Sequence, residues 1–403
     1  MNTTSVSFRL LRSPCWLLHS LSGALFTFCA LIVATETKAE ANYTFTLIAD
    51  STGPFSDFGA VPSPSLNATG MVGFFASLDN GSSGVFKGSG GNVTIIGINS
   101  VPLGGTAYPR INQAGTVAFY ASNWNGVGAR IIAGNGGPLI TIADTAGQFK
   151  DFASGYSTSI NTAGTVAFWA SQDSGPSGIF AGNGGATTPV FLNSLSLSTD
   201  FSVSMNDAGT VAFRAGNKTR IVTVNGGLVT TIVDNSGPFN YFGAAPSLNE
   251  TGTVAFVAGV GGIDGGVFGV YSGNGGPLTT IADLSGPFSS FSSFNSNQPS
   301  INGAGTVAFA AGLDAGGGGL FIGDGIGTSE VIGDGDPLFG STITGLGISP
   351  TSFNDSGQLA FYYELANGTK GIALATPTPE PTASLLLALT LGLSLARRPR
   401  RKC

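Results

Sequence analysis

The stretch Asn112-Gln113-Ala114-Gly115-Thr116-Val117-Ala118-Phe119 decides the fold, because the chain contains its pattern seven times. Each copy reads Asn-x-x-Gly-x-x-Ala-Phe, except that Gly73 replaces the alanine in the first copy. The copies begin at Asn67, Asn112, Asn161, Asn206, Asn249, Asn302 and Asn354, at intervals of 45, 49, 45, 43, 53 and 52 residues. Intervals of this length are typical of a repeat built from several short strands.

The second copy indicates how one unit is built. Short strands are expected over 109–112, 116–121, 129–133 and 139–144, where β-branched and aromatic residues lie between glycine-centred turns. In the second strand Val117 and Phe119 share one face, and the small Ala118 lies on the other. We therefore expect sheets to stack with the phenylalanine of one unit against the alanine of its neighbour. The packed series would contain Phe74, Phe119, Phe168, Phe213, Phe256, Phe309 and Phe361.

The two ends of the repeat region decide between a closed ring and an open stack. Residues 43–50 match the fourth strand of a unit, whereas the seventh unit stops at a third strand over 371–375. A blade built from both chain ends closes a propeller, while an open solenoid would need polar caps. The sequence thus predicts an all-β fold, a seven-bladed β-propeller of four-stranded blades closed by the N-terminal strand. A β-solenoid is the alternative.

Polar turn residues recur in every unit. The Asn-x-x-Gly step is expected to form a turn, with the asparagine side chain bonded to the backbone two residues on. Asp-x-x-Gly steps begin at Asp50, Asp144, Asp234 and Asp283 and are expected to do the same. Binding of Ca²⁺, which prefers oxygen ligands, is the alternative for these carboxylates. A second acidic cluster, Gly333-Asp334-Gly335-Asp336 with Asp324, lacks EF-hand spacing, so we predict no cofactor.

Both termini carry targeting features. Residues 1–41 have a basic start at Arg9 and Arg12, an apolar stretch and small residues at Ala39 and Ala41, which predicts a secretory signal peptide. An uncleaved anchor is the alternative. After the repeat domain, 42–376, the tail 377–403 contains the uncharged segment 382–396 and a basic end. This segment is expected to be a short, marginal membrane segment, and the basic end would stay cytoplasmic.

The tail resembles the PEP-CTERM sorting signal of exported bacterial proteins. The matching residues are Pro379, Glu380, Pro381, the leucine-rich segment, and Arg397, Arg398, Arg400 and Arg401. The resemblance implies recognition by an exosortase-type membrane protease, and release or transfer to the surface of a cell that makes extracellular polysaccharide. A permanent short anchor is the alternative. Residues 43–375 also resemble the tandem-repeat family named for its NxxGxxAF motif, which brings no established activity.

Composition excludes several kinds of chemistry. His19 and the cysteines Cys15, Cys29 and Cys403 all lie in the terminal segments, so the repeat domain has no disulfide, Ser-His-Asp triad or histidine-ligated metal. Between residues 42 and 376 there are eight Lys and Arg against nineteen Asp and Glu, a net charge of −11. This charge opposes binding to nucleic acid or anionic lipid.

Three functions remain. The favoured one is a non-enzymatic structural or interaction module of the cell surface or extracellular matrix, meeting surface proteins or polysaccharide. The second is a lectin-like propeller that binds sugars through Tyr120, Trp124, Trp169 and Tyr271. Clustering of these rings on one rim would favour sugar binding, and placement between blades would favour packing. The third and least favoured is a glycoside hydrolase, which needs only two carboxylates at the right separation.

Overall fold

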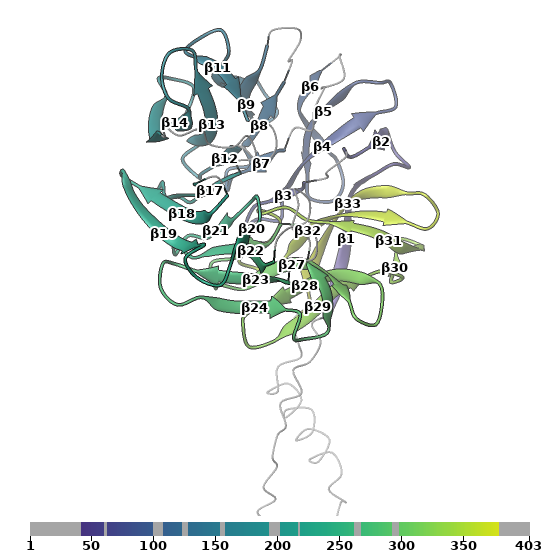
Figure 1. The fold of residues 1–403 in the computed structure, drawn as a ribbon. Coiled ribbons are helices and arrows are strands. Elements are labelled where there is room, and N and C mark those ends of the chain that lie inside the picture. The colour runs from purple at the N-terminus through teal and green to yellow at the C-terminus, as the bar shows by residue number, and fades with distance from the viewer. Residues whose placement is uncertain are drawn as a thin grey trace, which may run out of the picture. The chain divides into compact units, whose positions relative to one another are not determined.

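The described part of the chain folds into a ring of β-sheets. The computed structural model describes residues 42–378 apart from 60–62, 100–107, 123–127, 154–157, 193–201, 217, 262–266 and 292–297. These residues belong to the unit Glu40–Cys403, and the other unit, Met1–Ala39, lies outside the described ranges. Every regular element within them is a strand, and the strands form seven antiparallel sheets. Figure 1 shows the sheets arranged radially, one sheet per blade, so the fold is the predicted seven-bladed β-propeller.

The blades follow the order of strands predicted from the sequence, except that the first strand of blade 7 is reduced to an isolated bridge between Phe353 and Leu359. Blades are numbered here by their copy of the motif. The short first strands are β3 (Ser65–Leu66), β7 (Arg110–Ile111), β12 (Thr158–Ile160), β16 (Val203–Met205), β21 (Ser247–Leu248) and β26 (Ser300–Ile301). The second strands are β4 (Val72–Leu78), β8 (Val117–Ala121), β13 (Val166–Gln172), β17 (Val211–Ala215), β22 (Val254–Val260), β27 (Val307–Leu313) and β32 (Leu359–Leu365). First strands of neighbouring blades contact one another, which places them next to the axis.

The third and fourth strands lie further out. The third strands are β5 (Ser83–Gly88), β9 (Arg130–Gly134), β14 (Gly178–Gly182), β18 (Arg220–Asn225), β23 (Val267–Gly273), β28 (Gly318–Gly323) and β33 (Lys370–Pro377). The outermost strands are β6 (Thr94–Asn99), β10 (Ile140–Asp144), β15 (Thr188–Leu192), β19 (Leu228–Asp234), β24 (Thr279–Asp283), β29 (Thr328–Gly333) and β1 (Tyr43–Asp50).

The second strand also pairs with a separate stretch of chain that precedes the first strand. These stretches are β2 (Phe55–Asp57), β11 (Phe149–Phe152), β20 (Tyr241–Phe242), β25 (Phe288–Phe291) and β31 (Ser341–Gly347), and β31 also pairs with β30 (Pro337–Leu338). The inner edge of these blades is thus one strand interrupted by a loop. The sequence predicted only the short first strand of this edge. The added stretch contains a Phe-x-x-Phe pattern, in which Phe55 packs edge-on against Phe74 and Phe86.

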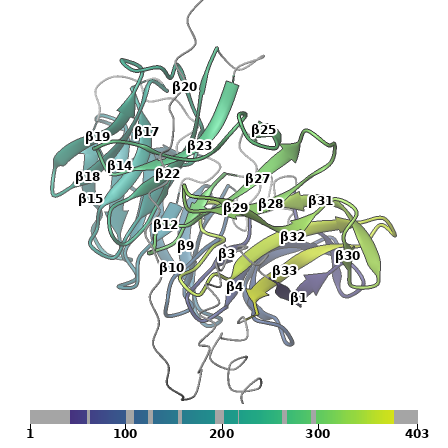
Figure 2. The same cartoon turned by 90° about the horizontal axis from the view of Figure 1, so that it is seen from below.

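The seventh blade is closed by the two ends of the propeller. β1 pairs antiparallel with β33 from Tyr43 opposite Pro377 to Asp50 opposite Gly371, and the two strands lie side by side in Figures 1 and 2. β1 therefore occupies the place of a fourth strand, as the register of the repeat predicted. Hydrogen bonding continues to Thr378, whose backbone N–H donates to the Asn42 carbonyl at 2.8 Å, slightly beyond the predicted end of the domain at 376.

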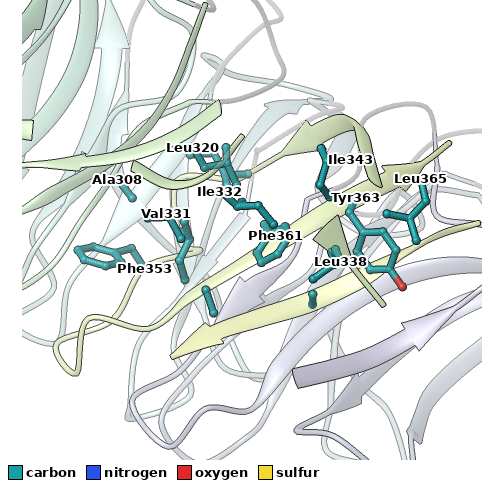
Figure 3. Close-up of a cluster of buried hydrophobic side chains, with 14 residues drawn as sticks. Ala308, Leu320, Val331, Ile332, Leu338, Ile343, Phe353, Phe361, Tyr363 and Leu365 are labelled. Atoms are coloured by element: carbon teal, nitrogen blue, oxygen red, sulfur yellow. The ribbon is translucent and has the colours of Figure 1, made fainter. Parts of the chain in front are cut away.

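Phenylalanine and alanine of the motif join neighbouring blades, as predicted. Phe361 of blade 7 lies in one buried cluster with Ala308 and Leu320 of blade 6, and Figure 3 shows members of this cluster from both blades. Ala118 likewise shares a buried cluster with Phe168, and Ala255 shares one with Phe309. All seven phenylalanines are at most 1% exposed. At about 25 cal/mol per Å² of buried apolar surface, these interfaces supply the main stabilisation of a chain that has no disulfide in the repeat domain.

A second contact between blades was not foreseen. Every outermost strand contains a β-bulge at one β-branched residue, namely Ile48, Ile96, Ile142, Val190, Ile232, Ile281 or Val331. In blade 1 the bulged Ile96 points at Gly134 of blade 2, where a β-carbon would lie 3.3 Å from Ile96 Cγ2. The bulge turns a side chain of the edge strand into the interface and also disrupts a straight edge that could pair with another molecule.

Candidate functional site at the mouth of the central channel

The seven motif asparagines form the turns predicted for them. Each is at most 8% exposed, and the Oδ1 of Asn112 accepts the N–H of Thr116 at 2.9 Å. The same bond to the residue four positions on occurs in every copy. In Asn67, Asn249 and Asn354 the Oδ1 also accepts the N–H two positions on, as expected. The glycine of the turn has positive φ, for example +78° at Gly115, which favours glycine.

The Nδ2 of five motif asparagines joins the blades. Asn112 Nδ2 donates to the Asn161 carbonyl of the next blade at 3.0 Å, and Asn354 Nδ2 donates to Asn67 at 3.0 Å, across the closure of the ring. Asn67, Asn206 and Asn249 make the equivalent bond to the next motif asparagine. The motif asparagines are therefore structural residues. Their role between blades was not predicted, because it requires two asparagines about 45 to 50 residues apart to meet.

A ring of serines lies two residues before the asparagines. Ser65 Oγ accepts the N–H of Ile111 in the next blade at 3.0 Å. The same bond runs from Met205 to Ser159, from Leu248 to Ser204, from Ile301 to Ser247 and from Phe353 to Ser300. These bonds satisfy backbone donors on the inner strands, which have no further strand to pair with. In blade 2 the equivalent residue is the buried Arg110.

The residue directly after each asparagine surrounds the open end of the channel, and it differs from blade to blade. These residues, called here the mouth residues, are Ala68, Gln113, Thr162, Asp207, Glu250, Gly303 and Asp355. Several of the side chains reach back to the preceding blade. Glu250 Oε2 accepts the N–H of Asp207 at 2.9 Å, and Asp355 Oδ1 accepts the N–H of Gly303 at 2.6 Å. Three carboxylates therefore belong to one ring of otherwise uncharged residues.

A cavity of about 140 Å³ lies at this mouth. Glu250, Asp355 and Gln113 line it together with inner-strand residues of several blades. Further in, the stretch 349–352 crosses between blades: Ser349 Oγ donates to the Pro64 carbonyl, and the Pro350 carbonyl accepts from Ser247 Oγ, both at 2.6 Å. Ser349 and Ser352 are fully buried. The mouth is therefore a shallow funnel whose floor is formed by this stretch.

The carboxylates of the mouth affect one another. Burial raises the pKa of Glu250, the backbone N–H of Asp207 opposes this shift, and the negative charges of Asp207 and Asp355 add to it. A carboxyl group with a raised pKa beside ionised carboxylates can hold a proton or attract a cation. The funnel thus combines polar groups from several blades with one perturbed acid.

The Asp-x-x-Gly residues form turns, as predicted. Asp283 Oδ1 accepts both the N–H and the hydroxyl of Ser285, at 2.9 and 2.5 Å, and these bonds lower the pKa of Asp283. Asp50 and Asp234 cap their own turns in the same way, and Asp144 accepts the N–H of Ala146. Each turn connects the outermost strand of one blade to the inner edge of the next, so one carboxylate serves each connection.

The acidic cluster of blade 6 is divided between two ends of a hairpin. Asp324 caps the turn between β28 and β29 by accepting the N–H groups of Ile326 and Gly327. Asp334 and Asp336 follow the far end of β29, where Asp336 Oδ2 accepts the N–H of Gly333 at 2.9 Å. Within the described ranges no group of three or more His, Cys, Asp or Glu residues is arranged to hold a metal ion.

The aromatic candidates for sugar binding lie between blades. Trp169 is 6% exposed and belongs to the buried cluster that joins blades 3 and 4. Tyr271 stacks on Phe256 and contacts Phe239, and Tyr120 packs against the cluster between blades 2 and 3. Trp124 lies outside the described residues. By the criterion set from the sequence, the described rings favour packing over sugar stacking.

The predicted terminal segments also lie outside the described residues. They comprise the signal peptide 1–41, the sorting residues Pro379, Glu380, Pro381, Arg397, Arg398, Arg400 and Arg401, and the transmembrane segment 382–396. Among the residues that the structure does describe, no helix is long and apolar enough to cross a membrane.

Comparisons with known proteins support the fold. Residues 214–351 match the model of a family of unknown function, DUF7453. A comparison with curated proteins found no match. An oligogalacturonate lyase from Vibrio parahaemolyticus is 11% identical, with a TM-score of 0.51, over 85% of this chain and 99% of that one. A manganese complex of an oligogalacturonate lyase is 9% identical over 84% of this chain and 99% of that one, with a TM-score of 0.48. The Aleuria aurantia lectin is 13% identical over 71% of this chain and 99% of that one, with a TM-score of 0.38. At these identities the similarity concerns the propeller fold alone.

Proposed function

We propose that this protein is an exported β-propeller that acts as a non-enzymatic interaction module at the cell surface or in the extracellular matrix. Export rests on the N-terminal signal, and sorting by an exosortase-type protease rests on the C-terminal tail. The mouth residues are the binding surface. Partners are surface proteins or extracellular polysaccharide, and nucleic acid is disfavoured by the net charge of −11.

The observation that carries this proposal is the contrast between the motif and its neighbour in the sequence. Asn, Gly, Ala and Phe are the same in nearly every blade, and all four serve turns or contacts between blades. The residue directly after the asparagine varies, and in five of the seven copies it lines the cavity at the mouth. In repeat proteins, variation on one face of a uniform framework is typical of a binding surface.

Charge limits the partner. Asp207, Glu250 and Asp355 make the mouth negative, and the described surface has few basic residues to balance them. A neutral polysaccharide or a protein with a basic patch would bind without repulsion, whereas an anionic polymer would be repelled at low salt.

The test is binding of the purified protein to a panel of bacterial polysaccharides and to extracts of cell-surface proteins. Measurements are made with Ca²⁺ and with a chelator. The control is Asp314→Asn, an exposed carboxylate between β27 and β28. Saturable binding that is weakened by Asp355→Asn but not by Asp314→Asn supports the mouth as the binding surface. Equal loss of binding in both variants, or binding that neither substitution weakens, contradicts it.

A glycoside hydrolase, the least favoured of the three functions expected from the sequence, is the second candidate here, because Glu250 and Asp355 line one funnel and the pKa of Glu250 is raised. A raised pKa suits a general acid, and a neighbouring carboxylate suits a base or nucleophile. Release of reducing ends from a polysaccharide, abolished by Glu250→Gln, would establish this activity. If the wild-type protein releases no reducing ends from any polysaccharide of the panel, the hydrolase candidate is removed.

A further inference from the structure

The residue that directly follows the motif phenylalanine packs against the next blade. Trp169 lies in the buried cluster that joins blades 3 and 4, and Arg214 donates to the Phe242 carbonyl of blade 5 at 2.6 Å. The equivalent residues that belong to, or pack against, the buried clusters of their own interfaces are Phe75, Tyr120, Val257 and Tyr362. Six copies therefore fill this point between two blades with valine or a larger side chain, which is a ring in four of them.

Blade 6 has only Ala310 at this point, and a cavity of about 360 Å³, called here the blade 6/7 pocket, lies beside it. The wall from blade 6 continues at Gly312 and Gly318, which add no side chains. β31 of blade 7 forms the opposite wall with Gly345 and Leu346. Volumes from about 300 Å³ upward are typical of sites for small ligands. The pocket is therefore large enough for one ring and its substituents.

The pocket lies at the end of the blades opposite to the mouth. β27 leads from the motif turn at 302–305 to Ala310, Ala311 and Gly312 of the pocket. At about 3.3 Å per residue, this stretch of strand places the pocket roughly 20 Å from the turn. A small ligand in the pocket therefore does not reach Glu250 or Asp355 of the mouth.

Three polar side chains surround the pocket, those of Ser290, Thr344 and Asp334. All three residues are exposed, and within the described ranges none of their side-chain oxygens makes a hydrogen bond. Two of them offer hydroxyl groups that both donate and accept, and the third offers a carboxylate that accepts. These groups are therefore available to a ligand.

The lining narrows the class of ligand. Asp334 repels an anion, and among the described residues no Lys or Arg lines the pocket to balance a negative charge. A wholly apolar ligand would cover the hydroxyl groups and the carboxylate without replacing their bonds to water. A neutral sugar ring has C–H groups that pack against Ala310 and Leu346, and hydroxyl groups that donate to the carboxylate.

We propose that the blade 6/7 pocket binds one ring of a neutral sugar. Ala310 makes room for the ring, and Asp334, Ser290 and Thr344 are its hydrogen-bond partners. The inference rests on the proposed function only in taking a neutral polysaccharide as the source of the ring. It adds a second site to that function, because the mouth takes no part in it.

The test is calorimetric titration of the purified protein with the methyl glycosides of glucose, galactose and mannose, up to tens of millimolar. Ala310→Tyr fills the pocket with the side chain that blades 2 and 7 have at this point. We expect it to abolish binding without lowering the midpoint of thermal unfolding. Asp334→Ala should weaken binding several-fold, and the control Asp355→Asn, at the mouth, should bind as tightly as the wild-type protein.

The variants separate failure of this inference from failure of the proposed function. If the wild-type protein binds none of the three glycosides, the pocket inference is overturned, and binding of a polymer or a protein at the mouth still stands. Binding that Asp355→Asn weakens and Ala310→Tyr leaves unchanged places the sugar at the mouth, which also overturns the inference but supports the proposed function. If Ala310→Tyr does not fold, unchanged binding by Asp334→Ala overturns the inference by itself.

Discussion

Gly73→Ala restores the motif in the only copy that departs from it, and we expect it to stabilise the propeller. Gly73 lies on β4 opposite Ser65 and Lys87, in an extended conformation that alanine adopts freely. A β-carbon there would lie 3.5 Å from both Ile111 Cβ and Val117 Cγ2 of blade 2, which is ordinary van der Waals contact. The added methyl therefore fills the interface without displacing a neighbour.

The magnitude follows from two contributions. Burial of one methyl group gives about 0.8 kcal/mol, and replacing glycine in a strand removes about 0.5 to 1 kcal/mol of chain entropy lost on folding. The free energy of unfolding should therefore rise by about 1 to 2 kcal/mol. Alanines at the same position in the other blades are fully buried, for example Ala118 at 0% exposed.

Equilibrium unfolding in urea measures the change, with the midpoint expected to increase at unchanged slope. Ala118→Gly makes the reverse change in blade 2 and should lower the free energy of unfolding by a similar amount. Gly371→Ala is the matched control for glycine in a strand, because its β-carbon would lie 2.5 Å from the Ala49 carbonyl oxygen and from the Tyr363 hydroxyl. It should destabilise by about 1 to 3 kcal/mol. A neutral or destabilising Gly73→Ala, with Ala118→Gly still harmful, would refute the packing argument.

Three further predictions concern the polar groups. Asn354→Asp keeps the acceptor of the turn but replaces the donor to the Asn67 carbonyl with an oxygen. The free energy of unfolding should therefore fall by about 2 kcal/mol at pH 7, and by less when the carboxyl is protonated. Thermal melts at pH 4 and 7 check this, and an equal loss of stability at both pH values would contradict it. Glu250 has a raised pKa in the folded protein, so its contribution to stability is present at low pH and is lost as the pH rises through that pKa. Glu250→Gln should therefore stabilise at pH 7, by less than about 1 kcal/mol because solvent screens this partly exposed group, and have no effect near pH 4 in urea titrations. Asp283 has a lowered pKa, so its stabilisation is present at neutral pH and is lost as the pH falls through the lowered value. Ser285→Ala should move the pKa of Asp283 up toward its ordinary value in an NMR titration, and an unchanged pKa would show that the backbone N–H alone sets it.

The repeat itself was sufficient to predict the blades and their packing. Alternation in Thr116–Phe119 assigns Val117 and Phe119 to one face and Ala118 to the other, and a turn of fixed length sets the register of each hairpin. These are local properties of about ten residues. The order of strands at 43–50 and 371–375 then fixed the closure of the ring, since only one pairing completes the seventh blade.

Contacts between blades were beyond this reasoning, because they depend on how far and at what angle one sheet lies from the next. The sequence contains the isoleucines of the outermost strands, but only a bulge in the ladder directs Ile96 onto Gly134. The asparagine amide makes one bond in its own turn and another in the next blade, and only the first can be read locally.

The candidate site shows the same division. Composition excluded histidine and cysteine chemistry in the repeat domain, and turn geometry explained Asp50, Asp144, Asp234 and Asp283. Glu250 and Asp355 are 105 residues apart in the sequence and meet only because blades 5 and 7 converge on the axis. By itself the sequence determined the unit, the number of blades and the closure, whose physical causes are local. The tertiary structure decided which polar residues share the mouth, because curvature of the ring brings the ends of distant turns together.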